Sequence, residues 1–261
     1  MKLCSIASGS SGNCIYVANE DTHLLVDVGI SKKRIVEGLD SIGVDAHNID
    51  GILITHEHLD HIKGLGIMAR AFNIPIYGTY ETLRAINECK SMGAIDNALY
   101  RPIKADVEFN INSLVVKPFA TSHDAVNPVC YTFHSNDKKI SVATDLGEYN
   151  DYIVANLENS DVILLEANYD KNMLQVGPYP YYLKQRILSN RGHLSNVHTG
   201  ELLRCIISER LKYIFLGHLS KENNYPELAY ETVKVELHEV LKNENILKVA
   251  YRDKPSELVN I

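Results

Sequence analysis

Residues 55–61 read Thr55-His-Glu-His-Leu-Asp-His61 and follow directly on the apolar run Gly51-Ile-Leu-Ile54. Four side chains of types that commonly bind metal ions stand close together in this segment: His56, His58, Asp60 and His61. A strand that ends here and turns into a helix cannot point all four in one direction. It can offer the first two to one ion and the last two to a second ion beside it. Imidazole combined with carboxylate favours zinc, manganese or iron over calcium or magnesium.

The pattern His-x-His-x-Asp-His is the hallmark of the metallo-β-lactamase superfamily, and the chain resembles that family over nearly its whole length. Members carry further ligands in a fixed order, each at the end of a strand. Four apolar runs end in this way and in this order: His23–Asp27, Val115–His123, Lys139–Asp145 and Lys212–His218. The resemblance implies an α/β fold, the four-layer αββα sandwich, in which two mixed sheets lie between outer helices. We expect residues 1–261 to form a single domain of this fold.

The resemblance also implies a ligand set for two divalent metal ions, zinc or manganese, with iron as a further candidate. The implied ligands are His56, His58 and His123 for one ion, Asp60, His61 and His218 for the other, and Asp145 as a bridge. Asp27 is better placed to orient a ligand imidazole than to bind metal itself. Such a pair of ions leaves room for a bridging hydroxide, and the chemistry that follows is hydrolysis.

Three segments between Asp145 and the last ligand are similar to those of the tRNA 3′-processing endonucleases of the superfamily. They are Leu165-Glu-Ala-Asn168, Arg191-Gly-His-Leu-Ser195 and Leu216-Gly-His-Leu-Ser220. The similarity implies that His193 donates a proton to the leaving oxygen or contacts the phosphate, and that Glu166 orients it. The catalytic residues would then be Asp60, His193 and Glu166. Alternatively, Ser195 is the N-cap of the next helix and His193 is only a loop residue before it.

Two other segments are candidates for binding the substrate. In Ala7-Ser-Gly-Ser-Ser-Gly-Asn13, small residues let backbone N–H groups approach a phosphate, and Ser10, Ser11 and Asn13 add side-chain donors. The same residues also form an ordinary hairpin turn. Ser195 is a further candidate contact. Residues 169–191 interleave tyrosines with lysines and arginines, which could stack bases and hold a strand end, or could simply pack.

The spacing of the motifs indicates a compact member of the superfamily. His123 and Asp145 are too close in sequence for the protruding arm of the tRNA endonucleases, and Asp145 and His218 are too close for the inserted domain of the β-CASP nucleases. The best resemblance is to the bacterial YycJ/VicX/WalJ group, which implies a manganese-supported 5′→3′ DNA exonuclease with a part in DNA repair. An RNase, a hydrolase of small esters, thioesters or cyclic phosphodiesters, and a non-catalytic binding module are the alternatives.

Composition sets outer limits on these readings. The chain has 261 residues, of which 45% are hydrophobic and 23% charged, as in ordinary globular proteins. No apolar run is long enough to span a membrane, and the five scattered cysteines are typical of a reducing cytoplasm. The net charge of −7 argues against a protein that coats nucleic acid with a broad basic face. It leaves room for an enzyme that grips a few phosphates, with DNA ends favoured over RNA as the partner.

The hydrophobic pattern predicts strands alternating with helices. The expected strands are 2–6, 14–18, 23–28, 51–55, 101–104, 107–109, 114–119, 129–134, 139–144, 162–166, 212–217 and 246–251. The expected helices begin after Ser31 and at Pro226, and lie near 61–72, 80–91, 180–189 and 195–210.

Overall fold

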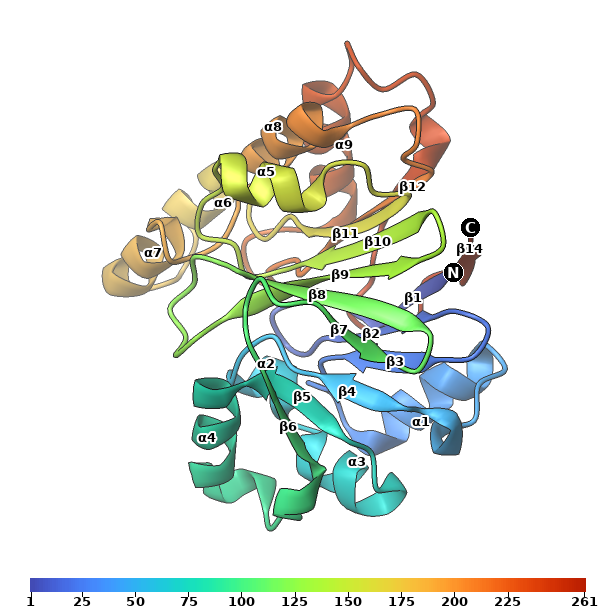
Figure 1. The fold of residues 1–261 in the computed structure, drawn as a ribbon. Helices are drawn as coiled ribbons and strands as arrows, with labels where there is room; N and C mark the ends of the chain where they lie inside the picture. Colours follow the sequence, from blue (N-terminus) through green and yellow to red (C-terminus); the bar gives the residue numbers. More distant parts are fainter.

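Two seven-stranded sheets lie face to face in the computed structural model, which describes residues 1–261 (Figure 1). The strands of the first sheet are, in spatial order, β14 (Val259–Asn260), β1 (Lys2–Ala7), β2 (Cys14–Ala18), β3 (His23–Val26), β4 (Gly51–Leu53), β5 (Ile76–Thr79) and β6 (Tyr100–Ile103). Those of the second are β13 (Leu247–Val249), β12 (Tyr213–Gly217), β11 (Val162–Glu166), β10 (Lys138–Ala143), β9 (Val129–Ser135), β8 (Leu114–Ala120) and β7 (Phe109–Ile111). Both sheets are mixed, with parallel runs from β3 to β6 and from β10 to β13.

Helices cover the outer face of each sheet (Figure 1). Those on the first sheet are α1 (Lys32–Ser41), α3 (Leu65–Phe72) and α4 (Tyr80–Glu88), and those on the second are α5 (Asp151–Leu157), α8 (Asn196–Ile206) and α9 (Pro226–Glu236). The remaining helices are short: α2 (Leu59–Ile62), α6 (Lys171–Val176), α7 (Tyr181–Leu188), and the 3-10 turns η1 (Ala46–Asn48), η2 (Lys90–Met92), η3 (Asn97–Leu99) and η4 (Glu244–Ile246). The expected αββα sandwich is thereby confirmed.

Three apolar layers hold the sandwich together. Leu24 and Val26 of β3 face the second sheet, whereas Leu25 between them faces the helices of its own sheet. Successive side chains of a strand point to opposite faces, so strands buried on both sides read as continuous apolar runs. Within the central layer, Tyr131 and Phe133 of β9 are fully buried. Each such side chain contributes about 1.5–3 kcal/mol through burial of apolar surface.

The expected helix near 61–72 is divided into α2 and α3. Gly64, at the break, donates its N–H to the carbonyl of Val28 at 2.8 Å. A Cβ at Gly64 would lie 2.3 Å from the carbonyl oxygen of Ile30, so only glycine permits this close approach. The loop after β3 therefore packs directly against the segment that carries the histidines.

Other differences from the sequence prediction lie at short or weakly patterned elements. The helices α5 and α6, the strand β5 and the two-residue strand β14 were not predicted. The strand expected at 107–109 begins only at Phe109, because Asp106 adopts a left-handed backbone (φ 64°) and turns the chain there. The last expected strand, 246–251, is limited to β13. No helix has both the length and the apolar character needed to cross a bilayer.

The first prediction concerns the hydrogen bond that links the two sheets beneath the histidine segment. The hydroxyl of the fully buried Tyr131 donates to the carbonyl oxygen of Ile54 at 2.7 Å. The Tyr131→Phe substitution removes the hydroxyl and leaves the Ile54 carbonyl without this donor. We therefore expect the free energy of unfolding to fall by about 1–3 kcal/mol. Urea denaturation measures the change. Tyr80→Phe, which alters a hydroxyl on an exposed side chain of α4, is the control and should unfold like the wild type.

Candidate metal centre

Three residues of the centre have a left-handed backbone where a strand ends. Asp27 follows β3, Asp145 follows β10 and His218 follows β12, with φ of 58°, 60° and 53°. Residues other than glycine seldom adopt this conformation, and where they do the position is commonly a functional one. All three side chains are buried, and they meet between the carboxyl ends of strands from both sheets.

The segment from the loop after β4 through α2 supplies most of the side chains that could bind a metal ion. His56 lies in this loop, His58 is the N-cap of α2, and His61 lies within the helix. The loop after β3 lies against it, because Gly29 has no side chain: a Cβ there would be 1.6 Å from the carbonyl oxygen of Asp60. The backbone N–H of Asn13 donates to the same oxygen at 2.8 Å. Two loops of the first sheet thus fix the histidine segment.

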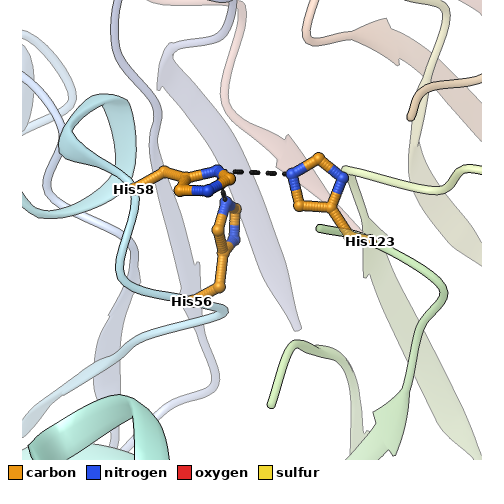
Figure 2. A group of neighbouring side chains, drawn as sticks. All are labelled: His56, His58 and His123. Atoms are coloured by element: carbon orange, nitrogen blue, oxygen red, sulfur yellow. Dashed lines mark hydrogen bonds between the residues drawn. The ribbon is translucent and has the colours of Figure 1, made fainter. Parts of the chain in front are cut away.

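One group of candidate metal ligands consists of three imidazoles. His56 Nε2 lies 3.0 Å from His58 Nδ1, and His123 Nε2 lies 3.3 Å from the same atom (Figure 2). His123 comes from the loop after β8 in the second sheet, so the group bridges the two sheets. Figure 2 shows the three rings directed at one another, with His56 and His58 on one segment of chain and His123 on another. Nitrogen lone pairs that converge in this way fit a cation between them.

A second group adjoins the first. His61 Nε2 lies 3.4 Å from Asp60 Oδ2, and His218 Nε2 lies 3.3 Å from the same oxygen. Asp145 stands between the groups: its Oδ2 is 3.3 Å from His61 Nε2, and its Oδ1 is 3.6 Å from His123 Nε2. Asp145 Oδ2 is buried and accepts no hydrogen bond in the structure. A buried, unpartnered carboxylate oxygen facing imidazole nitrogens fits a metal ligand well.

The ring nitrogens of His61 and His123 that face away from the proposed metal positions are hydrogen-bonded. Asp27 Oδ2 accepts from His61 Nδ1 at 2.8 Å, and the carbonyl oxygen of Gly192 accepts from His123 Nδ1 at 2.9 Å. Asp27 is itself held, since it accepts from the backbone N–H and the hydroxyl of Thr55, each at 2.9 Å. Such outer contacts fix the tautomer and ring orientation of metal-binding histidines.

Buried negative charge dominates the electrostatics of the centre. Burial by itself would lower the pKa of His218, but the carboxylates of Asp145, Asp60 and Glu166 outweigh it and raise that pKa to about 10. His61 follows the same pattern: Asp145, Asp60 and Asp27 outweigh burial and raise its pKa well above the usual value. The centre therefore requires positive charge, which divalent cations would supply.

Glu166 connects this centre to His193. Its Oε1 accepts from His193 Nδ1 at 2.7 Å and from His218 Nδ1 at 2.8 Å, and its Oε2 accepts from the backbone N–H of Leu146 at 2.8 Å. The His193 ring centre is 5.0 Å from that of His123, and its side chain is 18% exposed. No protein group is hydrogen-bonded to His193 Nε2. That nitrogen is therefore available to a ligand at the mouth of the centre.

The expected substrate contacts occupy different kinds of position. Ser10 and Ser11 are exposed beside the centre, as a contact requires. Asn13 is fully buried: its Oδ1 accepts from the backbone N–H of Gly9 at 3.0 Å, and its Nδ2 lies 3.2 Å from His61 Nε2. Ser195 is the N-cap of α8 and accepts from the N–H of His198 at 3.2 Å. Asn13 and Ser195 are thus buried and form hydrogen bonds within the protein, and their contact with substrate stays a prediction.

The segment 169–191 also divides. Tyr169 is buried and packs with Leu174 and Ile187, whereas Tyr181 and Tyr182 on α7 are 77% and 74% exposed. The sequence pattern did not separate these two roles, because the large amphipathic side chain of tyrosine suits both a buried contact and an exposed face.

Several parts of the centre were not predicted. The carbonyl oxygen of Gly192 accepts from His123, and the hydroxyl of Thr55 donates to Asp27. A backbone carbonyl and a single threonine form no recognisable sequence motif. Arg191 donates to the carbonyl oxygen of His123 at 3.0 Å and so fixes the loop after β8.

Comparison with known proteins identifies the family. A family model described as a beta-lactamase superfamily domain matches residues 22–214. The chain belongs to the metallo-β-lactamase superfamily. It is 41% identical to "Exodeoxyribonuclease WalJ" of Streptococcus pneumoniae over 89% of this chain and 86% of that protein. It is 36% identical to "Exodeoxyribonuclease YycJ" of Bacillus anthracis over 90% and 88% of the two chains.

A solved structure of a superfamily member agrees on the fold. The metallo-β-lactamase fold protein YhfI of Bacillus subtilis superposes with a TM-score of 0.72 at 17% identity, covering 98% of this chain and 99% of that one. The resemblance stated from the sequence is confirmed. Membership of the superfamily and the cluster of imidazoles and carboxylates together indicate a centre for divalent metal ions.

The second prediction tests how Asp27 supports the metallo-β-lactamase centre. In Asp27→Asn the shape is kept, and asparagine tolerates the left-handed backbone. One acceptor oxygen is lost, so His61 is no longer held by a carboxylate. We expect metal affinity to fall about 10–100-fold, measured by competition with a chelator.

Asp106→Asn is the matched control. Asp106 also has a left-handed backbone (φ 64°) and accepts a hydrogen bond from the hydroxyl of Tyr152, but it is exposed. It should bind metal like the wild type. Equal affinities in both variants would show that Asp27 does not orient the ligand.

Proposed function

We propose that the chain is a metal-dependent exodeoxyribonuclease that degrades DNA from its 5′ end. The observation that carries the proposal is the joining of the metal-ligand cluster to His193 through one carboxylate, Glu166. Similarity to the two curated exodeoxyribonucleases supports DNA over RNA as the substrate. The proposal extends to a cytoplasmic enzyme with a part in DNA repair, the setting that the resemblance implies.

We assign two divalent ions to the centre, zinc or manganese, with iron as a further candidate. One would be held by the three imidazoles of His56, His58 and His123, the other by Asp60, His61 and His218, with Asp145 shared between them. Mixed imidazole and carboxylate donors suit all three metals. Such ions lower the pKa of a water molecule and withdraw charge from a phosphodiester.

His193 is assigned the protonation of the leaving oxygen. Burial by itself would raise the pKa of Glu166, but His193 and His218 outweigh it and lower that pKa, so Glu166 is ionised at neutral pH. The ionised carboxylate accepts from His193 Nδ1 and leaves Nε2 directed away from it. A proton on Nε2 can then pass to the departing alkoxide, a step that general acids accelerate about 10²–10⁴-fold.

The third prediction tests the reaction itself. Metal-stripped protein is reloaded separately with manganese and with zinc, then incubated with end-labelled linear duplexes that do or do not carry a 5′ phosphate. Closed circular DNA and single-stranded RNA are run beside them. We expect nucleotides to be lost progressively from the 5′ end of linear DNA only. Asp60→Ala exposes any contaminating nuclease. Intact linear DNA with degraded RNA would transfer the proposal to an RNase, and no cleavage at all would contradict it.

The fourth prediction separates His193 from the metal ligands. His193→Ala should bind metal normally yet cleave DNA about 10²–10⁴-fold more slowly. Its activity on the p-nitrophenyl ester of thymidine 5′-monophosphate should change little, because nitrophenolate departs without a proton. His238→Ala, on an exposed loop residue, is the control. Equal losses on both substrates would rule out protonation of the leaving group as the role of His193.

A further inference from the structure

A donor-rich patch borders the metal centre where the segment near the C-terminus meets the loop 8–13. The N–H of Ser8 donates to the carbonyl of Tyr251 at 3.0 Å, and its Oγ accepts from the backbone N–H of His218 at 2.8 Å. Ser8 therefore links Tyr251, and with it the neighbouring Arg252, to the candidate metal ligand His218. The side chain of Arg252 extends from this segment over the loop.

Arg252 is fixed in place yet has no carboxylate partner. Its Nη1 donates to Ser11 Oγ at 3.1 Å and its Nη2 to the carbonyl of Leu219 at 2.9 Å. Glu222 and Asp253 act on it electrostatically, but neither forms an ion pair with it. A guanidinium has five N–H donors, so three have no acceptor in the protein. In a chain with a net charge of −7, an unpaired, half-buried arginine beside the active centre calls for an anionic ligand.

The two serines add donors on the same side. Ser11 Oγ accepts from Arg252, and Ser10 Oγ accepts from the backbone N–H of Lys221 at 3.3 Å. Both hydroxyls act as acceptors within the protein, which leaves their O–H groups free to donate. Ser10 and Ser11 are exposed, and the exposed side chain of Lys221 forms no ion pair. The patch therefore presents N–H and O–H donors together with positive charge.

We propose that Arg252, with Ser10 and Ser11, binds a phosphate of the nucleic-acid strand whose neighbouring phosphodiester lies at the metal centre. A phosphate offers several acceptor oxygens, which suit the planar fork of arginine and adjacent hydroxyls. The proposal rests on the proposed function, since it assumes a nucleic-acid substrate. The phosphate is either the one at the 5′ end or one within the strand, and the experiment distinguishes the two.

The test measures binding by the metal-loaded protein. Fluorescent single-stranded oligonucleotides with hydrolysis-resistant phosphorothioate linkages, with and without a 5′ phosphate, are titrated with wild type and Arg252→Gln at several salt concentrations. We expect about tenfold weaker binding by the variant, as for the loss of one charge-assisted contact. The slope of log affinity against log salt should also decrease by about 0.7, the value for one phosphate contact on a single strand.

The two ligands locate the phosphate. If the wild type prefers the phosphorylated oligonucleotide and the variant loses that preference, Arg252 binds the terminal phosphate. If both ligands weaken equally, it binds an internal one. Arg101→Gln is the matched control, because Arg101 likewise donates to backbone carbonyls, those of Ala98 and Tyr100, on the exposed strand β6.

A second variant protects the test against misfolding. Ser11→Asp places a carboxylate beside Arg252 on an exposed loop, so it should weaken binding without loss of thermal stability. If Arg252→Gln and Ser11→Asp both bind like Arg101→Gln while the wild type binds and degrades DNA, only this inference fails. If the wild type binds no oligonucleotide, the proposed function fails with it.

Discussion

Concentrated negative charge in a buried place is the constraint on which the rest of this structure depends. Asp27, Asp145 and Glu166 are all almost completely buried, and Asp60 lies beside them. Carboxylates are rarely buried without partners, because removing an ion from water is costly. The histidines partly compensate this negative charge, and bound divalent cations would compensate it more fully. The loops, caps and outer hydrogen bonds described above hold the donors close together against their own repulsion.

The arrangement of the two sheets explains how these carboxylates and histidines come to lie close together. Parallel runs from β3 to β6 and from β10 to β13 end on the same side, so residues that follow different strands meet without long loops. Neither sheet holds the centre alone: the first supplies His56, His58 and His61, and the second supplies His123 and Asp145. Contacts between the sheets, such as that of Tyr131 with Ile54, therefore bear on the metal centre as well as on stability.

Features of the fold and of the centre that depend on residue type could be predicted from the sequence. The family resemblance carried by the histidine segment and by the polar residues after apolar strands predicted the fold, and the side chains that it named lie close together. Contacts made by the backbone could not be predicted, as with the carbonyl of Gly192 that accepts from His123. The burial of Asn13 and Ser195 and their hydrogen bonds within the protein could not be predicted either, because no residue pattern distinguishes such bonds from a ligand contact. Arg252 was missed because its relation to the loop 8–13 exists only after folding.

The left-handed backbones of Asp27, Asp145 and His218 bear on how such a chain changes in evolution. A residue other than glycine in this conformation costs about 1–3 kcal/mol, and glycine would remove the strain. Selection for folding alone would therefore favour glycine at these three strand ends, whereas selection for the centre retains the side chains. A duplicated copy that has lost its chemistry should drift toward glycine there first, and grow more stable as it does so.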